Sequence, residues 1–281
     1  MILITGANGQ LGQDFQKLFK EKEMAFIATD SSELDITDID AIRDFVEHRK
    51  ITTIINCAAY NAVDKAEEDY INAYKVNSFA VRNLALVANE FGADFIHYST
   101  DYVFDGKSKR PYLIFDPVNP KSVYGHSKYS GEKIALDTCK KSYVLRTSWV
   151  FGEGNTNFVK KIIEWAEGKE ELKVVDDQIS SPSYTVDLAK ATLDLIKSKN
   201  YGLYHMTNSG SCSRYEWAEY ILNSIGWKGK LIAAKSADFK TAAERPEYSV
   251  LDNLGLKEAI GYELPNWKDA TDRFLKEIKI D

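Results

Sequence analysis

Short apolar runs alternate along the chain with longer stretches in which apolar residues recur every three or four positions. The runs that predict β-strands lie at residues 1–5, 25–30, 52–58, 94–100, 142–148 and 172–177. The periodic stretches between them predict helices at residues 10–22, 37–50, 72–92 and 127–139. Strands that alternate with helices are typical of βαβ units, whose crossovers are right-handed. The sequence therefore predicts an α/β fold with a Rossmann-type, doubly wound parallel sheet.

This alternation weakens after about residue 150. Two further helical patterns, at 155–170 and 213–226, cannot both cover the same sheet as the earlier helices. We therefore expect a dinucleotide-binding domain of residues 1–150, to which 172–205 return. Residues 151–171 and 206–281 then form a smaller, mainly helical substrate-binding lobe.

A glycine-rich turn separates the first predicted strand from the first predicted helix. Gly6, Gly9 and Gly12 are spaced three apart in the segment TGANGQLG. Glycine lets the backbone turn tightly and approach a pyrophosphate, which the free N–H groups of a helix N-terminus bind. Asp30 ends the second strand, where an acid accepts hydrogen bonds from the adenosine ribose. The alternative is that the glycines serve only close packing of strand and helix.

The turn implies a nicotinamide dinucleotide. Because Asp30 is followed by Ser31 and Ser32 and not by an arginine, NADH is slightly favoured over NADPH. A loop after the second strand is placed to cover the adenine, and small residues after the third strand leave room for the cofactor or merely pack closely. The expected cofactor contacts are Gly6, Gly9, Gln10, Leu11, Gly12, Asp30, Asp35, Ile36, Ala58, Ala59, Tyr60, Tyr124 and Lys128.

The segment SVYGHSKYSGEK contains two overlapping pairs of a tyrosine followed four residues later by a lysine. The pairs are Tyr124 with Lys128 and Tyr129 with Lys133. Residues four apart share one face of a helix, so each pair is plausible by itself. The two tyrosines are five residues apart and point roughly 140° away from each other. Only one pair can therefore face a cofactor.

The neighbours of each pair favour the first one. The stripe through Tyr124 continues with small residues such as Gly131, which let a helix pack tightly, whereas the stripe through Tyr129 continues with Glu132 and reads as a solvated face. A free tyrosine titrates near ~10, and a neighbouring ammonium lowers that pKa. We therefore predict that Tyr124, tuned by Lys128, donates a proton to a carbonyl oxygen.

The fourth predicted strand ends in two hydroxyl residues, Ser99 and Thr100. Successive strand residues face opposite sides of a sheet, so only one of them can reach a substrate. The spacing alone does not choose between them.

The charge and the composition of the chain argue against several classes of function. A net charge of -6 and an isoelectric point near 5.4 argue against a nucleic-acid or anionic-membrane surface. Three scattered cysteines and four scattered histidines show no metal-ligand spacing, so we expect free thiols and no metal site. No leader or membrane span is evident, which favours a cytoplasmic protein. We expect it to be a monomer or a homodimer.

At this point the residues resemble a known family. The segments TGANGQLG, VDKAE, HYSTDYVFDG, VYGHSKYSGEK, RTSWVFG and ERPEYSVLD together resemble the dTDP-4-dehydrorhamnose reductases, which are extended short-chain dehydrogenases/reductases. The resemblance runs nearly end to end. It implies that NADH or NADPH reduces the C4 ketone of a dTDP-sugar, dTDP-4-dehydro-L-rhamnose, to dTDP-L-rhamnose.

The resemblance also implies site residues. The family's catalytic threonine, tyrosine and lysine fall on Thr100, Tyr124 and Lys128, and its substrate-binding positions fall on Thr100, Asp101, Trp149 and Arg245. Two of these positions have a plainer explanation than substrate binding. Trp149 could be an aromatic core residue, and Arg245 could form a surface ion pair. Ser180 and Ser183 depart from the family pattern, in which a glycine and a threonine are common.

Two other functions compete with this one. The first is another reaction on the same scaffold, by a nucleotide-sugar epimerase or a 4,6-dehydratase. Dehydratases of this superfamily follow the threonine with Asp-Glu, whereas Asp101 and Tyr102 stand here. The second is a non-catalytic, NAD(P)-binding regulatory subunit, against which an intact Thr100, Tyr124 and Lys128 set argues.

Overall fold

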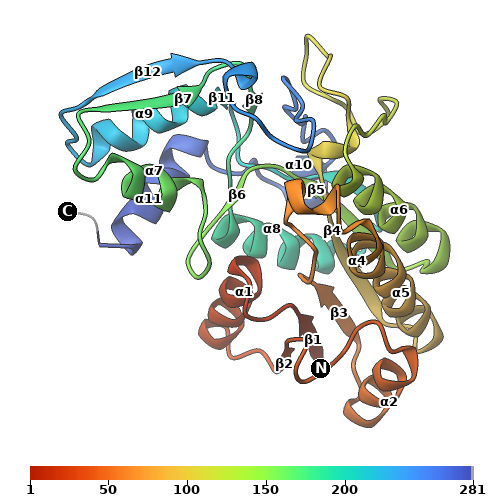
Figure 1. The fold of residues 1–281 in the computed structure, drawn as a ribbon. Helices are drawn as coiled ribbons and strands as arrows, with labels where there is room; N and C mark the ends of the chain where they lie inside the picture. The colour runs from red at the N-terminus through yellow and green to blue at the C-terminus, as the bar shows by residue number, and fades with distance from the viewer. Residues whose placement is uncertain (280–281) are drawn as a thin grey trace.

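The computed structural model describes residues 1–279, in which six parallel strands form one central sheet in the order β10-β5-β4-β3-β1-β2 (Figure 1). The strands are β1 (Ile2–Thr5), β2 (Phe26–Thr29), β3 (Thr53–Asn56), β4 (Asp94–Thr100), β5 (Ser142–Thr147) and β10 (Gly202–His205). The chain passes from β1 outward to β2 and then back across β1 to β3. The strand order therefore reverses between β1 and β3, the place where sheets of this type bind ligands.

Helices cover both faces of the sheet (Figure 1). Neighbouring strand residues face opposite sides, so Leu3 and Ile54 pack into one core and Ile4 and Ile55 into the other. The first core is covered by α2 (Ile39–Arg49), α5 (Ala80–Glu90) and α6 (Val123–Thr138), and the second by α1 (Gln10–Glu21) and α8 (Thr185–Ser198). Between β3 and α5 the chain forms α3 (Val63–Ala66), α4 (Tyr70–Tyr74) and a π-helical turn, η1 (Lys75–Phe79).

A separate apolar cluster lies beyond the sheet, around Trp217. It is built by α7 (Phe158–Ala166), α9 (Arg214–Ser224), α11 (Trp267–Glu277) and a two-stranded sheet of β7 (Glu171–Val175) and β12 (Lys230–Ala234). Short pairs join the segments between the two parts: β6 (Val150–Phe151) with β9 (Ser183–Tyr184), and β8 (Ile179–Ser180) with β11 (Cys212–Ser213). The short 3-10 turns are η2 (Asp101–Val103) and η3 (Ser236–Asp238).

The five predicted strands before residue 150 are all present in the central sheet, and the predicted helices are present within a few residues of their expected bounds. The sixth predicted strand is present as β7, but its predicted place in the central sheet is wrong. Residues 172–177 do not join the central sheet, because β7 pairs with β12 in the helical part, and β10 occupies the sixth position. Helix α10 (Leu256–Ile260) also departs from the expected division, since Leu256 packs into the sheet core beside α8.

Helix α6 is held against the sheet by a buried ion pair. Ser122 caps its first turn by accepting a hydrogen bond from the N–H of Gly125 at 3.1 Å. Two turns further on, Glu132 receives two hydrogen bonds from the Arg146 guanidinium, one of them at 2.9 Å, and a third from Ser99 at 2.9 Å. Glu132 is 2% exposed, so the expected solvated stripe on this face is wrong at this position.

Three chemical features of the described residues bear on function. Cys57, Cys139 and Cys212 are all free thiols, as expected. Within residues 1–279, no three or more histidine, cysteine, aspartate or glutamate side chains gather closely enough to hold a metal ion. None of the helices in the same range combines the length and the apolar character needed to cross a membrane.

We predict that Glu132→Leu lowers the free energy of unfolding by about 3–5 kcal/mol, because it leaves the Arg146 charge buried without its partner. Urea unfolding measures this change. The control is Glu263→Leu, which breaks the exposed pair with Lys257 and should cost at most about 1 kcal/mol. Equal effects of the two variants would contradict the structural role of the buried pair.

Candidate active site

The carboxyl ends of β4 and β5 open onto a cavity of about 350 Å³ beside the glycine turn. One wall comes from the first turn of α1, a second from the start of α6, and a third from the segment after β5 together with the first residue of α9. The lining includes Thr100, Tyr124, Lys128, Trp149 and Arg214. The cavity thus lies at the edge of the sheet where the topology predicts a ligand.

The glycine turn leaves no room for side chains. Gly6 has a φ of +67°, and a Cβ there would lie 2.6 Å from the backbone nitrogen of Ala58. A Cβ on Gly12 would lie 2.5 Å from the carbonyl oxygen of Gly6. Helix α1 begins after Gly9 with no side-chain cap, so its first N–H groups are available to a ligand. This bare helix start fits the pyrophosphate of a dinucleotide.

Three side chains with acid-base or hydrogen-bonding chemistry meet in the cavity. Thr100 ends β4, and its hydroxyl contacts the phenol of Tyr124, which lies in the first turn of α6 as predicted. Lys128 lies one turn further along and donates from Nζ to the carbonyl oxygen of Tyr98 at 2.5 Å. The Ser99 hydroxyl is instead committed to Glu132. The structure therefore selects Thr100 from the two hydroxyls that the spacing left open.

Burial sets the protonation of these groups. It raises the pKa of Tyr124 well above its ordinary value, while the hydrogen bond with Thr100 lowers it by a smaller amount. Burial also lowers the pKa of Lys128 to about 8, against the opposing effect of Glu132. The predicted lowering of the tyrosine pKa by Lys128 is thus wrong here, because desolvation dominates. Tyr124 is a neutral phenol at physiological pH and can donate a proton.

Asp101 follows Thr100 and ties the cavity wall to distant parts of the chain. Its carboxylate accepts hydrogen bonds from Ser249 at 2.6 Å, from Thr100 at 3.1 Å and from Ser180 at 3.4 Å. Burial raises the pKa of Asp101 to about 6, although these hydrogen bonds oppose the shift. Ser180, one of the two departures from the family pattern, therefore supports Asp101.

Trp149 stands where the chain leaves β5 for the helical part. It adopts a left-handed conformation with a φ of +45°, and its ring stacks on Trp217 with centroids 5.9 Å apart. The guanidinium carbon of Arg214 lies 3.6 Å from the Trp149 ring centroid. Trp149 is half-buried, so it both packs on the aromatic cluster and lines the cavity.

Arg245 forms the ion pair that the plainer alternative foresaw. Its two terminal nitrogens donate to the two carboxylate oxygens of Asp64, at 3.0 and 2.6 Å. This fork is therefore occupied by a protein carboxylate, whose pKa it lowers.

The expected site residues divide into three groups. The cavity lining contains Gly9, Gln10, Leu11, Gly12, Ala59, Thr100, Asp101, Tyr124, Lys128 and Trp149. Gly6 and Ala58 do not line it; they lie against each other, and Ala58 stands between the lining residues Cys57 and Ala59. The lining does not include Asp30, Asp35, Ile36, Tyr60 or Arg245. Asp30 still supports the turn, because it accepts a hydrogen bond from the N–H of Asn8 at 3.3 Å.

Arg214 was not among the predicted site residues, because it stands at a helix start 65 residues beyond Trp149 and matches no motif. Tyr102 was also not predicted to line the site; its ring meets that of Tyr124 edge-on, with the ring centroids 5.6 Å apart. One feature of the sequence could have pointed to Arg214: it directly follows the serine that caps an aromatic-rich helix.

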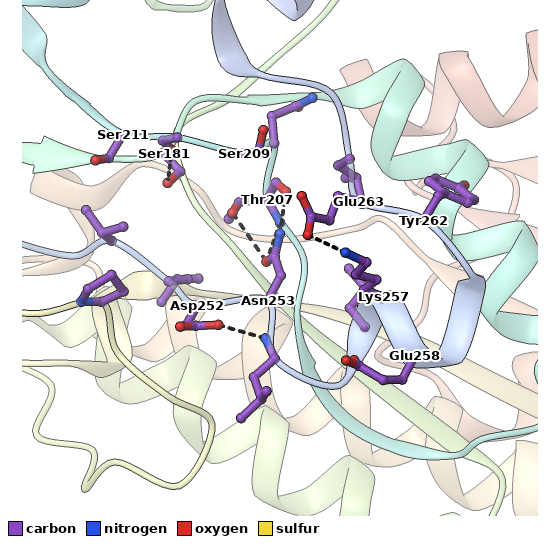
Figure 2. A pocket seen from close by; sticks show the side chains of 18 residues that line it. Ser181, Thr207, Ser209, Ser211, Asp252, Asn253, Lys257, Glu258, Tyr262 and Glu263 are labelled. Atoms are coloured by element: carbon purple, nitrogen blue, oxygen red, sulfur yellow. Dashed lines mark hydrogen bonds and ion pairs between the residues drawn. The ribbon is translucent and has the colours of Figure 1, made fainter.

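A second cavity, of about 430 Å³, lies beyond the end of β10 (Figure 2). Its polar side chains largely bind one another: Lys257 pairs with Glu263 at 2.8 Å, and Asn253 donates to the carbonyl oxygen of Thr207 at 2.8 Å. Neither Tyr124 nor any part of the glycine turn lines it. Although this cavity is larger than the one beside the glycine turn, it lacks these groups and is therefore not the candidate active site.

The class of protein follows from three features: the order of the strands in the sheet, the glycine turn and the Tyr124–Lys128 pair. Together they define a Rossmann-type protein that binds a nicotinamide dinucleotide. Comparison with known proteins gives the narrower class. Residues 1–280 match the family described as the RmlD substrate binding domain, and the chain belongs to this family.

Relatives of similar length are known. The spore coat polysaccharide biosynthesis protein SpsK of Bacillus subtilis is 39% identical over 98% of this chain and 97% of its own. A dTDP-4-dehydrorhamnose reductase of Clostridium acetobutylicum, 44% identical, has a crystal structure that covers 99% of both chains with a TM-score of 0.96. The Bacillus anthracis dTDP-4-dehydrorhamnose reductase in complex with NADP, 38% identical, covers 98% of both chains with a TM-score of 0.95.

We predict that Gly6→Ala lowers the free energy of unfolding by at least about 2 kcal/mol more than Gly168→Ala. Both glycines have nearly the same left-handed φ, +67° and +66°, so both variants incur the backbone cost of roughly 1–2 kcal/mol. Only at Gly6 does the added Cβ collide with the backbone of Ala58, whereas Gly168 has open space. Thermal and urea unfolding measure the difference, and equal losses would contradict the tight turn.

Proposed function

We propose that this chain reduces the C4 ketone of dTDP-4-dehydro-L-rhamnose to dTDP-L-rhamnose, with NADH or NADPH as the hydride donor. The observation that carries the proposal is the neutral phenol of Tyr124 beside Thr100 and Lys128, in one cavity with the glycine turn. Membership in the RmlD family supports it, as does the NADP complex of the Bacillus anthracis relative.

The proposed chemistry is a transfer of hydride to a carbonyl carbon and of a proton to its oxygen. The dinucleotide, when bound, supplies the hydride. When the substrate is bound, the Thr100 hydroxyl would turn its one proton from Asp101 to the ketone oxygen and align it, and Tyr124 gives that oxygen its phenolic proton. One hydrogen bond of the Lys128 ammonium goes to Tyr98, which leaves two donors to hold the cofactor's nicotinamide ribose. The glycine turn and the start of α1 hold the pyrophosphate.

The proposed division of the chain follows the packing. The central sheet with its helices binds the dinucleotide, and the aromatic cluster around Trp217 forms the substrate-binding lobe. Three free cysteines are typical of a reducing compartment, so we propose a cytoplasmic enzyme, monomeric or homodimeric.

The dehydratase alternative is disfavoured by the residue after Asp101. Elimination of water needs an acid-base pair next to the threonine, and Tyr102 stands there instead. Burial raises the pKa of Tyr102 to about 12, so it is not a carboxylate substitute at neutral pH. The regulatory alternative predicts no consumption of reduced cofactor. Purified protein mixed with NADPH or NADH and enzymatically made dTDP-4-dehydro-L-rhamnose tests both, with nicotinamide absorbance as the readout.

We predict that Tyr124→Phe lowers kcat by about 10²–10⁴-fold, the range for loss of a general acid, and leaves NADPH binding unchanged. Steady-state kinetics and cofactor fluorescence measure the two quantities. Tyr129→Phe is the matched control, because Tyr129 packs against the apolar cluster of Val103, Phe104, Tyr112 and Leu251 away from the cavity. Loss of activity in the control alone would contradict the assignment.

We also predict that kcat/KM falls as pH rises through about 8, the pKa of Lys128. Below that pH Lys128 is an ammonium that can hold the cofactor, and above it the amine is neutral. In Lys128→Arg the guanidinium keeps its charge, so the fall should move to a higher pH. A pH profile for both proteins measures this, and coincident profiles would assign the titration to another group.

A further inference from the structure

Two acceptors compete for the single proton of the Thr100 hydroxyl. In the structure this proton goes to Oδ1 of Asp101, across an oxygen–oxygen distance of 3.1 Å. In the proposed reaction the ketone oxygen needs the same proton, and a hydroxyl has only one hydrogen to donate. The hydrogen bond from Thr100 to Asp101 must therefore break when the ketone binds.

The other hydrogen bonds of Asp101 do not replace the lost one. They come from Ser249 at 2.6 Å and from Ser180 at 3.4 Å, and both reach the second carboxylate oxygen, Oδ2. Asp101 is only 2% exposed, so water has little access to the carboxylate. A buried carboxylate oxygen that keeps its charge and loses its donor is costly in free energy.

The protonation of Asp101 is sensitive to this loss. Burial raises the pKa of its carboxyl group to about 6, and the hydrogen bonds from Ser249 and Thr100 oppose that shift. At neutral pH the group is therefore mostly ionised while Thr100 donates to it. When Thr100 turns to the ketone, the pKa of Asp101 rises from about 6 towards neutral pH, because one of the opposing hydrogen bonds is gone.

The charged and titratable groups that face Asp101 from other elements do not prevent this rise. Arg214 on α9 lowers the pKa of Asp101 by less than the two hydroxyl groups do, and its guanidinium is stacked on Trp149. Tyr102 on η2 and Tyr124 on α6 are neutral phenols, since burial raises the pKa of both. Hydrogen bonding therefore does more than charge to keep the carboxylate ionised.

We propose that Asp101 takes up a proton from solvent when the ketone binds, and that its neutral carboxyl group then donates to Thr100. Asp101, Thr100 and the ketone oxygen would form one hydrogen-bonded chain. Thr100 Oγ1 can complete it, because one of its two lone pairs accepts the N–H of Tyr102 at 3.2 Å and the other can accept the carboxyl proton.

This inference rests on the proposed function and leaves its proton balance unchanged. Tyr124 still gives its proton to the ketone oxygen, and the proton on Asp101 returns to solvent when the product leaves. Asp101 lines the active-site cavity, which gives that proton its path. Asp101 is a positioning residue here, because it acts on the ketone through Thr100. In the competing arrangement it stays ionised and accepts a hydroxyl group of the sugar.

The test is calorimetric titration of the full chain, loaded with NADP⁺, with enzymatically made dTDP-4-dehydro-L-rhamnose. NADP⁺ has no hydride to give, so binding is measured without reaction. Repeating the titration in buffers of different ionisation enthalpy counts the protons taken up. At neutral pH we expect at least about half a proton per site, and none in Asp101→Asn. The control is Asp176→Asn, because Asp176 also accepts a serine hydroxyl, that of Ser213 at 2.6 Å, but lies outside the cavity.

Two further variants give independent readouts. Ser249→Ala removes a donor that keeps Asp101 ionised, so the pH of maximal proton uptake should rise by about one unit, even if Asp101→Asn fails to fold. In kinetics, an asparagine N–H can donate to Thr100 as the neutral carboxyl does. Asp101→Asn should therefore keep kcat within about threefold, whereas Asp101→Ala should lower it by about tenfold or more.

The outcomes separate this inference from the proposed function. If the protein reduces the ketosugar but takes up no proton on binding it, the inference is overturned and the reductase remains. Equal proton uptake in Asp101→Asn also overturns it, since another group would then be the one that titrates. A protein that neither binds nor reduces the ketosugar removes the proposed function, and this inference with it.

Discussion

The seating of helix α6 on the sheet is the constraint on which the site depends. Glu132 and Arg146 form their ion pair almost without solvent, and Gly131 lies so close to the π-helical turn that a Cβ would be 2.0 Å from the carbonyl oxygen of Asn77. These contacts fix the rotation and the height of the helix. The packing of the helix therefore presents Tyr124 and Lys128 to the cavity, where Lys128 is also held by its hydrogen bond to Tyr98.

Burial of the reacting groups has opposite effects on the phenol and the amine. It favours the neutral form of each, and this raises the pKa of Tyr124 and lowers that of Lys128. A reductase benefits from the first change, since the phenol keeps the proton that it must donate. It tolerates the second, since a pKa of about 8 still leaves Lys128 charged at neutral pH. In this site desolvation therefore outweighs the attraction between phenolate and ammonium that the Tyr-x-x-x-Lys spacing suggests.

The sequence predicted correctly those features of the structure that depend only on residues close together in the chain. Strands β1 to β5, the glycine turn and the choice of Tyr124 over Tyr129 follow from periodicity, turn chemistry and helix geometry. The placement of residues 172–177 could not be predicted in this way, because the alternation of apolar and polar residues in a strand does not indicate which sheet the strand joins. Glu132 was misjudged for a similar reason: its partner Arg146 lies on another element, and a lone charge on a helix reads as solvated.

The active site exists only where the two parts of the chain meet. Asp101 of the sheet side binds Ser249 and Ser180 of the other side, and Arg214 reaches back from α9 onto Trp149. The groups for proton transfer all come from the sheet and α6, whereas Arg214, which lines the same cavity, comes from the helical part. Changes in the helical part can therefore alter which nucleotide sugar enters while the reduction chemistry stays intact, which is how one scaffold serves several substrates.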